Sequence, residues 1–378
     1  MCVRFGAGER TEEACTVLDA ETGSLDLPAC PDWIWPNADA AGYYRSALAA
    51  EDTARLGRAL GKPHRLSTVE RVQFGHDLEA AFASAALPGG DVLRALEPFA
   101  RDPHGAVALV PRKLLELVDA FVVDGPDQAA RRTSLRARIA RLYAPAVAQL
   151  GFAPQASDSP WRRRLRTELF GFLALQIEDP AVLDEAARRG RRMLGLDRDR
   201  TRHPDAVAPD LADLALAAAA RRGGADVFDA LVAELARSED AQVRQRTLVA
   251  LAQTRDPALI GRALDLALDP GLRKNERLVA LRGLLGATAT RDAAWAWLTA
   301  HFDALAPLLP DRFGGQIPGM IRMCDARRID EVRAFFAPRI EQLTGGPRNL
   351  AQALEAAAQC AARVAAQRDS VLAYLDAR

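Results

Sequence analysis

Histidine is scarce in this sequence, and no two histidines stand where they could share a metal ion. A zinc-binding helix of the His-Glu-x-x-His kind needs two histidines four residues apart, so that both imidazoles lie on one face. No such pair occurs among the five isolated histidines, which are His64, His76, His104, His203 and His301. The sequence also lacks a Gly-x-Ser-x-Gly elbow and a phosphate-binding loop with its lysine. We therefore expect no catalytic residue, bound cofactor or metal site in this chain.

An excess of positive charge is also missing. The 50 lysines and arginines are balanced by 50 aspartates and glutamates. Nucleic-acid binding requires a concentrated positive field, so this balance argues against a nucleic-acid partner. Nearly all of the positive charge is arginine, since lysine occurs only at Lys62, Lys113 and Lys274.

Long apolar runs are absent, although 49% of the residues are hydrophobic. No stretch approaches the roughly 18 uninterrupted apolar residues of a membrane helix, so we expect no membrane span. No cationic segment precedes an apolar run, so we expect no signal peptide. Aromatic residues make up only 6%, while alanine and leucine dominate. That composition is typical of packed helices.

Closely spaced cysteine pairs are absent too. The five cysteines contain no Cys-x-x-Cys and are widely separated: Cys2, Cys15, Cys30, Cys324 and Cys360. An odd number at such spacings favours reduced, mostly buried thiols in a cytoplasmic protein.

Residues 1–47 show short alternating apolar runs separated by turn-forming residues, including Gly6-Ala7-Gly8. This pattern predicts about four short β-strands. Four such strands cannot bury both faces, so we expect part of a β-sandwich whose other sheet lies elsewhere. The chain also begins on a strand-like run, and we expect the start of a longer protein to be missing. An uncovered apolar face would then favour self-association; its residues are Val3, Phe5, Val17, Leu25, Leu27 and Trp33.

From residue 48 to 378 the apolar period changes from 2 to 3.6, which predicts helices. Ser67 and Glu70 form a capping-box pattern at the start of one of them. Aspartate–proline pairs indicate further helix starts; they begin at Asp102, Asp179, Asp256 and Asp269. Short loops between helices of this length predict antiparallel hairpins. We therefore expect a mainly α protein, with 48–378 as a curved α-solenoid of the HEAT or armadillo kind.

Arginines cluster near several predicted helix ends. Most such runs are solvated helix faces. The alternative is a cationic wall suited to the carboxylate of a bound peptide. The candidates for that wall are Arg162, Arg163, Arg166, Arg327 and Arg348. The sequence does not show which side any of them faces.

Several motifs occur together and in order along the chain. Asn37 is followed by Gly42-Tyr43-Tyr44-Arg45, and Leu66-Ser67 by Glu70-Arg71. Further along come Ala250-Leu251-Ala252 with Asp256-Pro257, Ala294-Trp295, and Arg348 with Gln352-Ala353-Leu354-Glu355. In this order they resemble the end of the β-sandwich and the C-terminal helical domain of M1-family zinc aminopeptidases, the ERAP1-like type. Arg363, where that family usually has tryptophan, departs from the pattern.

The resemblance implies a domain that covers a catalytic domain and shapes its peptide-substrate cavity. Zinc would be held only in a catalytic portion, because the His-Glu-x-x-His and Gly-x-Met-x-Asn motifs of that family do not occur here. The implied partners are a peptide substrate and such a catalytic portion, in cis or in trans. The alternative is a free-standing helical-repeat module that binds proteins or peptides. The strands in 1–47 favour the first possibility.

Overall fold

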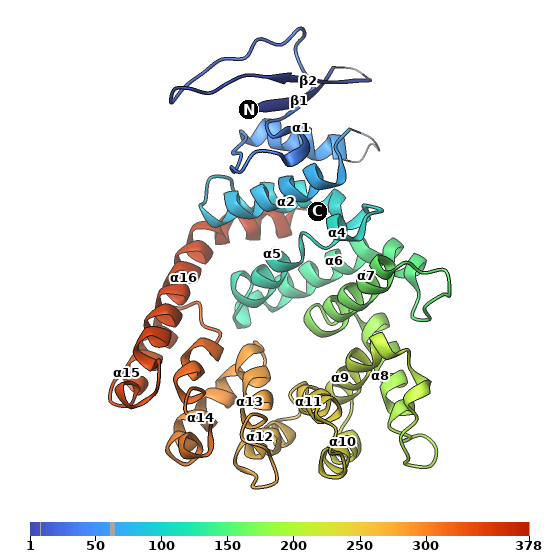
Figure 1. Cartoon of the computed structure of the whole chain (residues 1–378), viewed down its shortest axis with the longest axis vertical. Coiled ribbons are helices and arrows are strands. Elements are labelled where there is room, and N and C mark those ends of the chain that lie inside the picture. Colours follow the sequence, from blue (N-terminus) through green and yellow to red (C-terminus); the bar gives the residue numbers. More distant parts are fainter. Residues whose placement is uncertain (8, 61–64, 378) are drawn as a thin grey trace. The chain divides into compact units, whose positions relative to one another are not determined.

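A computed structural model describes residues 1–7, 9–60 and 65–377, and it is mainly α-helical (Figure 1). The described residues form sixteen α-helices and three short β-strands. They divide into two compact units. The first comprises residues 1–169 and 363–378, and the second comprises residues 170–362. The predicted mainly α class is therefore confirmed.

The first unit begins with a three-stranded antiparallel sheet in the order β2-β1-β3. Its strands are β1 (Cys2–Ala7), β2 (Arg10–Cys15) and β3 (Trp33–Trp35). The expected fourth strand, around Leu25 and Leu27, does not form, and that run stays irregular. Pro28 follows it and has no N–H to donate to a sheet.

The apolar face of this sheet is covered, contrary to our expectation. Val3, Phe5 and Trp33 are each at most 3% exposed, because α1 (Ala50–Leu60) packs against the sheet. Trp35 contacts Phe74 of α2 (Thr68–Ala83) edge to face. Helices thus take the place that we assigned to a missing second sheet. Only Val17 of the expected face is strongly exposed, at 84%.

The buried carboxylate of Glu70 joins three segments of the first unit. Its Oε1 accepts hydrogen bonds from Arg4 Nε at 2.7 Å and Asp39 N at 2.8 Å. Its Oε2 accepts from Ser67 N at 2.7 Å, which completes the predicted capping box at the start of α2. These bonds hold β1 and the segment after β3 against α2. Because 1–47 packs within this unit, a domain boundary at residue 47 stays a prediction.

The first unit contains six further helices in whole or in part. They are α3 (Gly89–Leu96), α4 (Gly105–Ala108), α5 (Arg112–Leu117), α6 (Ala129–Leu150), most of α7 (Pro160–Gly171) and the C-terminal part of α16 (Gly346–Asp376). Of these, α3 and α4 pack directly on α2. Gln367 of α16 donates to the carbonyl oxygens of Phe82 and Leu87 at 2.8 and 3.0 Å. The end of α16 and the end of α2 therefore lie side by side (Figure 1).

The second unit is built from helices that contact the next one or two helices along the chain. They are α8 (Pro180–Met193), α9 (Ala212–Arg222), α10 (Ala225–Arg237), α11 (Ala241–Leu251), α12 (Pro257–Asp265), α13 (Arg277–Gly286), α14 (Arg291–Leu305), α15 (Ala326–Phe336) and the first part of α16. Neighbour packing of this kind is expected of stacked hairpins. The curved solenoid itself stays a prediction.

Aspartate–proline pairs begin some helices but not all of the expected ones. Asp179 and Asp256 cap α8 and α12, each with proline at the first helical position. Asp269 instead accepts a bond from Gly271 N within a turn, and α13 begins only at Arg277. Asp102 accepts from His104 N, and the following helix is capped by His104. At both positions the aspartate–proline pair lies in a turn, and the next helix begins a few residues later.

The cysteines correct our expectation of reduced, mostly buried thiols. Cys2 and Cys15 lie directly opposite each other on β1 and β2 and form a disulfide. Cys324 and Cys360 form a second one, across 36 residues of sequence. Cys30 is free and exposed. Sequence spacing could not show these pairs, because strand register and helix packing bring the partners together.

Membrane insertion can be checked against the helices directly. None of those in the described part of the chain combines the length and the apolar run needed to cross a bilayer.

Candidate functional site

The candidate arginines of the peptide wall fall in both units. Arg166 of α7 is fully buried, and its guanidinium donates to the carbonyl oxygens of Leu150 and Gly151 and to Asp158 at 2.6 to 3.0 Å. Those carbonyls end α6, so Arg166 caps a neighbouring helix and cannot reach a peptide. Arg162 also pairs with Asp158, at 2.8 Å. Arg163 is exposed on the same helix.

Two further candidates lie in the second unit. Arg327, on the first turn of α15, pairs with Glu331 at 2.7 Å. Arg348, on the first turn of α16, is exposed. The structure thus brings Arg162, Arg163 and Arg166 together on α7 and holds Arg327 and Arg348 on other helices. A peptide-binding role for the four accessible arginines stays a proposal.

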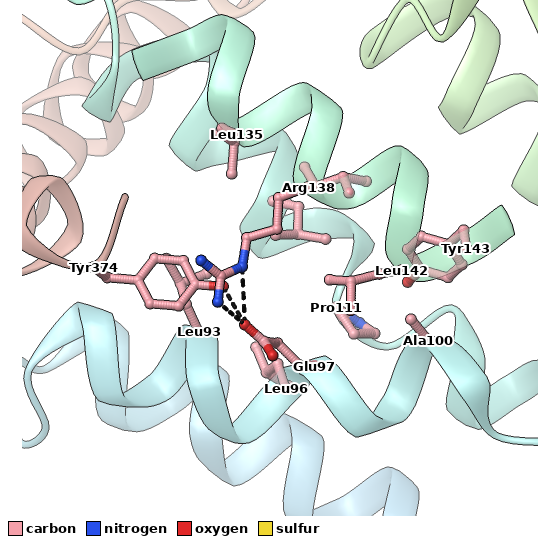
Figure 2. Close-up of a pocket in the computed structure, with 12 residues that line it drawn as sticks. Leu93, Leu96, Glu97, Ala100, Pro111, Leu135, Arg138, Leu142, Tyr143 and Tyr374 are labelled. Carbon is pink, nitrogen blue, oxygen red and sulfur yellow. Dashed lines mark hydrogen bonds and ion pairs between the residues drawn. The ribbon is translucent and has the colours of Figure 1, made fainter. Parts of the chain in front are cut away.

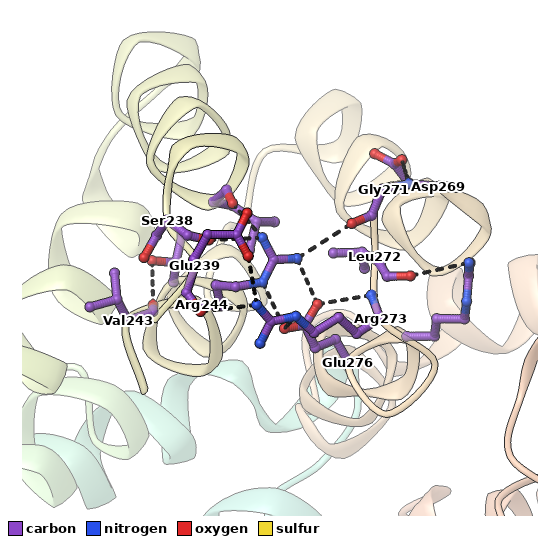
Figure 3. Close-up of polar contacts among 12 residues, drawn as sticks. Ser238, Glu239, Val243, Arg244, Asp269, Gly271, Leu272, Arg273 and Glu276 are labelled. Atoms are coloured by element: carbon purple, nitrogen blue, oxygen red, sulfur yellow. Dashed lines mark hydrogen bonds and ion pairs between the residues drawn. The ribbon is translucent and has the colours of Figure 1, made fainter. Parts of the chain in front are cut away.

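Buried arginines recur as structural residues in the second unit. Arg244 forms a two-pronged ion pair with Glu276, with both N–O distances 2.7 Å (Figure 3). Its guanidinium also donates to the carbonyl oxygen of Leu235 at 2.7 Å. Glu276 also accepts a hydrogen bond from Arg273 N at 3.0 Å. The bonds from Arg244 hold the pKa of Glu276 below its usual range. These contacts fasten α10, α11 and α13 together.

The first unit contains a small cavity beside Tyr374 that is a packing joint rather than a binding site (Figure 2). Its volume is about 20 Å³, which accommodates one water molecule. Glu97 Oε1 accepts bonds from Arg138 Nη2 and Tyr374 Oη, both at 2.6 Å. The Arg138 guanidinium also lies 4.3 Å from the centre of the Tyr374 ring. The cluster fixes the end of α16 against α6.

A much larger open cavity lies at the segment that leads from β3 into α1. We call it the Arg45 cavity, and its volume is about 1050 Å³. The segment 40–45, α2, α5 and the C-terminal part of α16 line it. All of these belong to the first unit, and α2, α5 and α16 can be followed in Figure 1. The lining residues are Ala40, Gly42, Tyr43, Tyr44, Arg45, Gln73, His76, Glu79, Ala80, Ala83, Ser84, Lys113 and Arg363.

Local hydrogen bonds fix the rim of this cavity. The Asn37 amide bonds both N–H and C=O of Gly42, at 2.8 and 3.0 Å. Tyr44 Oη donates to the carbonyl oxygen of Pro36 at 2.7 Å. A Cβ at Gly42 would lie 2.0 Å from the Tyr44 ring, so the loop needs glycine there. The loop therefore holds Tyr43 outward, where it is fully exposed.

The charged groups of the cavity come from separate elements. Arg45 donates to the carbonyl oxygen of His76 at 3.3 Å. Lys113 of α5 makes no hydrogen bond or ion pair with another described residue. Arg363 Nε is buried and has no acceptor among the described residues. Glu79 is the one carboxylate in the described lining, and burial raises its pKa.

Sequence reasoning named Arg45 and His76 but assigned neither to a site, and it noted Lys113 only as one of three lysines. The signal that could have found the cavity was the Gly42-Tyr43-Tyr44-Arg45 motif. Its aromatic and cationic residues are held at a rim and are not needed for a core.

Zinc binding can be tested on the residues themselves. Within the described ranges, one group of three possible ligands lies close together, namely Cys2, Glu13 and Cys15. The two sulfurs are joined as a disulfide, so they do not fit a metal ion. His64 and Lys62 lie outside the described residues.

Comparison with known proteins identifies the family. Residues 33–359 match the family model described as the ERAP1-like C-terminal domain. The chain is 24% identical over 332 residues to aminopeptidase M1-C of Oryza sativa subsp. japonica, covering 85% of this chain and 36% of that protein. It is 21% identical over 346 residues to aminopeptidase 2 of Candida albicans, covering 90% and 36%. The puromycin-sensitive aminopeptidase of Caenorhabditis elegans is 20% identical over 320 residues, covering 81% and 32%.

The chain spans about a third of the length of the curated relatives that it matches. The match begins at β3 and extends over most of the helices of both units. The chain therefore belongs to the ERAP1-like C-terminal domain family, the C-terminal domain of M1 aminopeptidases.

Proposed function

We propose that this domain covers and shapes the peptide-substrate cavity of an aminopeptidase catalytic portion. The match over residues 33–359 carries the proposal, because the relatives are aminopeptidases of which the chain covers only about a third. The catalytic portion would supply zinc, and this chain would supply surfaces that select and orient peptides. The Arg45 cavity and the accessible candidate arginines Arg162, Arg163, Arg327 and Arg348 are surfaces of that kind.

The test uses the purified chain alone and mixed with an M1 catalytic portion that lacks its own helical domain. Alone, the chain should hold no stoichiometric zinc and release no product from an aminoacyl reporter. Mixed, it should change the ratio of rates for a long peptide and a short reporter, since a cover acts on access rather than on chemistry. One zinc per chain with chelator-sensitive activity would overturn the first expectation. An unchanged ratio under conditions where the two proteins bind would overturn the second.

Self-association through 1–47 is a further part of the proposal. The sheet supports it by its outer edge at β2 and by exposed Val17 and Leu18. Val17→Lys should weaken dimers seen by sedimentation and leave the helical signal unchanged. A chain that is monomeric at high concentration would remove this part.

A cytoplasmic location was expected from reduced cysteines. The two disulfides favour an oxidising compartment instead. Quantifying thiols in protein taken directly from cells under acid quench decides between the two locations.

A further inference from the structure

We propose that the Arg45 cavity is a recognition site for an acidic side chain, aspartate or glutamate, of an extended polypeptide. The inference rests on the proposed function in one respect, which is that the ligand is a peptide. It adds a chemical preference that family membership does not supply.

The first argument is uncompensated positive charge. Arg45, Lys113 and Arg363 come from three different segments and converge on one cavity. None of the three lies within ion-pair distance of a described carboxylate. Other arginines of the first unit form ion pairs with carboxylates, as Arg112 does with Glu168 and Arg138 with Glu97. Three unpaired cations in one cavity attract an anion.

The second argument concerns the carboxylates that act on these cations, of which only Glu79 is in the described lining. Glu79 faces the same cavity, and burial raises its pKa, which weakens its hold on a full negative charge. His76, Lys113 and Arg45 act in the opposite direction on that pKa, so all three lie near enough to influence it. Asp77 does not line the cavity but also acts on Arg45, so three permanent cations face two carboxylates and an excess of one positive charge remains.

The third argument is size and lining. A cavity of about 1050 Å³ lies at the upper limit of small-molecule pockets, which hold roughly 300–1,000 Å³, and it is open to solvent. Tyr43 and Tyr44 add aromatic surface with polar ends at the rim, a lining that suits peptide backbone and side chains. Nucleic acid is disfavoured because the chain as a whole carries no net charge.

The binding experiment uses the whole chain and a fluorescent peptide whose ends are acetylated and amidated, so that terminal charges play no part. One peptide carries two glutamates, and its matched control carries glutamines at the same positions. Anisotropy titrations at low salt should show about tenfold tighter binding of the glutamate peptide, and this advantage should shrink as salt rises. Equal affinity for the two peptides would overturn the inference.

Substitutions locate the binding. Lys113→Gln and Arg363→Gln should each weaken binding of the glutamate peptide about threefold to tenfold, whereas Glu79→Gln should strengthen it. Lys274→Gln is the matched control, because Lys274 is exposed in the other unit. An equal loss with Lys274→Gln would mean diffuse attraction and would overturn the inference. Lys113 is exposed, so its variant remains informative if Arg363→Gln fails to fold.

The peptide-binding result can be told apart from the result of the test of the proposed function. Failure of the peptide preference, together with an altered rate ratio of the catalytic portion, would remove only the acidic site. A peptide preference without any effect on a catalytic portion would support the acidic site and count against the covering role.

Discussion

Replacing Arg244 by methionine should be among the most destabilising single changes in the second unit. The side chains of Arg244 and Glu276 are only 7% and 5% exposed, so both charges depend on each other for solvation. Removing the guanidinium leaves the buried Glu276 carboxylate with the backbone N–H of Arg273 and a long contact, 3.9 Å, to the partly exposed Arg273 guanidinium. It also frees the carbonyl of Leu235. Breaking a buried pair in this way costs about 3–5 kcal/mol. For a unit of this size, that lowers the melting temperature by roughly 10 °C.

The measurement is urea-induced unfolding followed by far-ultraviolet circular dichroism, with each unit fitted as its own transition if two appear. The matched control is Asp229→Ala, which removes one partner of the Arg262–Asp229 pair, whose side chains are 49% and 58% exposed. That change should cost at most about 1 kcal/mol.

A double variant separates the two causes of the loss. Arg244→Met combined with Glu276→Leu removes both charges and should recover much of the stability, because no charge is left buried. If Arg244→Met costs no more than Asp229→Ala, the pair does not hold this unit together and the reasoning fails. If the double variant is no better than the single one, the loss comes from the carbonyl bonds and not from the stranded carboxylate.

Four further outcomes follow from contacts described above. Native protein should show one reactive thiol, Cys30, and Cys324→Ser should lower the free energy of unfolding by about 3 kcal/mol; five reactive thiols would contradict both. Ser67→Ala should cost about 1 kcal/mol in urea unfolding through loss of the capping box, and an unchanged midpoint would count against it. Tyr374→Phe should cost about 1 kcal/mol by the same assay, since it removes the bond to Glu97, and a neutral result would show that water replaces it. The pKa of Glu276 is lower in the folded state than in the unfolded state. Its ionised carboxylate therefore adds its full share to the free energy of unfolding above the unfolded pKa of about 4.3, and this share is lost as pH falls through the lower folded pKa. Wild type should lose more stability on acidification than the Arg244→Met and Glu276→Leu double variant.

Local patterns predicted much of the fold. The Ser67–Glu70 capping box and the helix starts at Asp179 and Asp256 formed as expected, because caps depend on residues within one turn. The helical class followed from the 3.6-residue periodicity and from the composition rich in alanine and leucine. What failed depends on contacts between distant segments. The burial of Phe5, the packing of α1 against β3 and the pairing of Cys324 with Cys360 could not be read from neighbours in sequence.

In the candidate site, too, features set by neighbouring residues could be predicted and features set by distant contacts could not. Arginine runs suggested a cationic surface, but the sequence could not tell Arg166, which caps α6 from within, from its exposed neighbour Arg163. Lys113 and Arg363 are 250 residues apart by numbering and meet only because the end of α16 packs near α2 and α5. A site assembled from such distant segments leaves no compact motif.

The division of the chain into two units has a consequence for the order in which it folds during synthesis. The first unit needs residues 363–378, which the ribosome makes only after the whole of the second unit, 170–362. Until then, the carbonyl oxygens of Phe82 and Leu87 have no hydrogen bond from the Gln367 amide, and Gly89 is not covered by Val371. The first unit must therefore wait in an incomplete, partly apolar state while the second unit folds, and that interval is when a nascent chain is most open to aggregation or to capture by a chaperone.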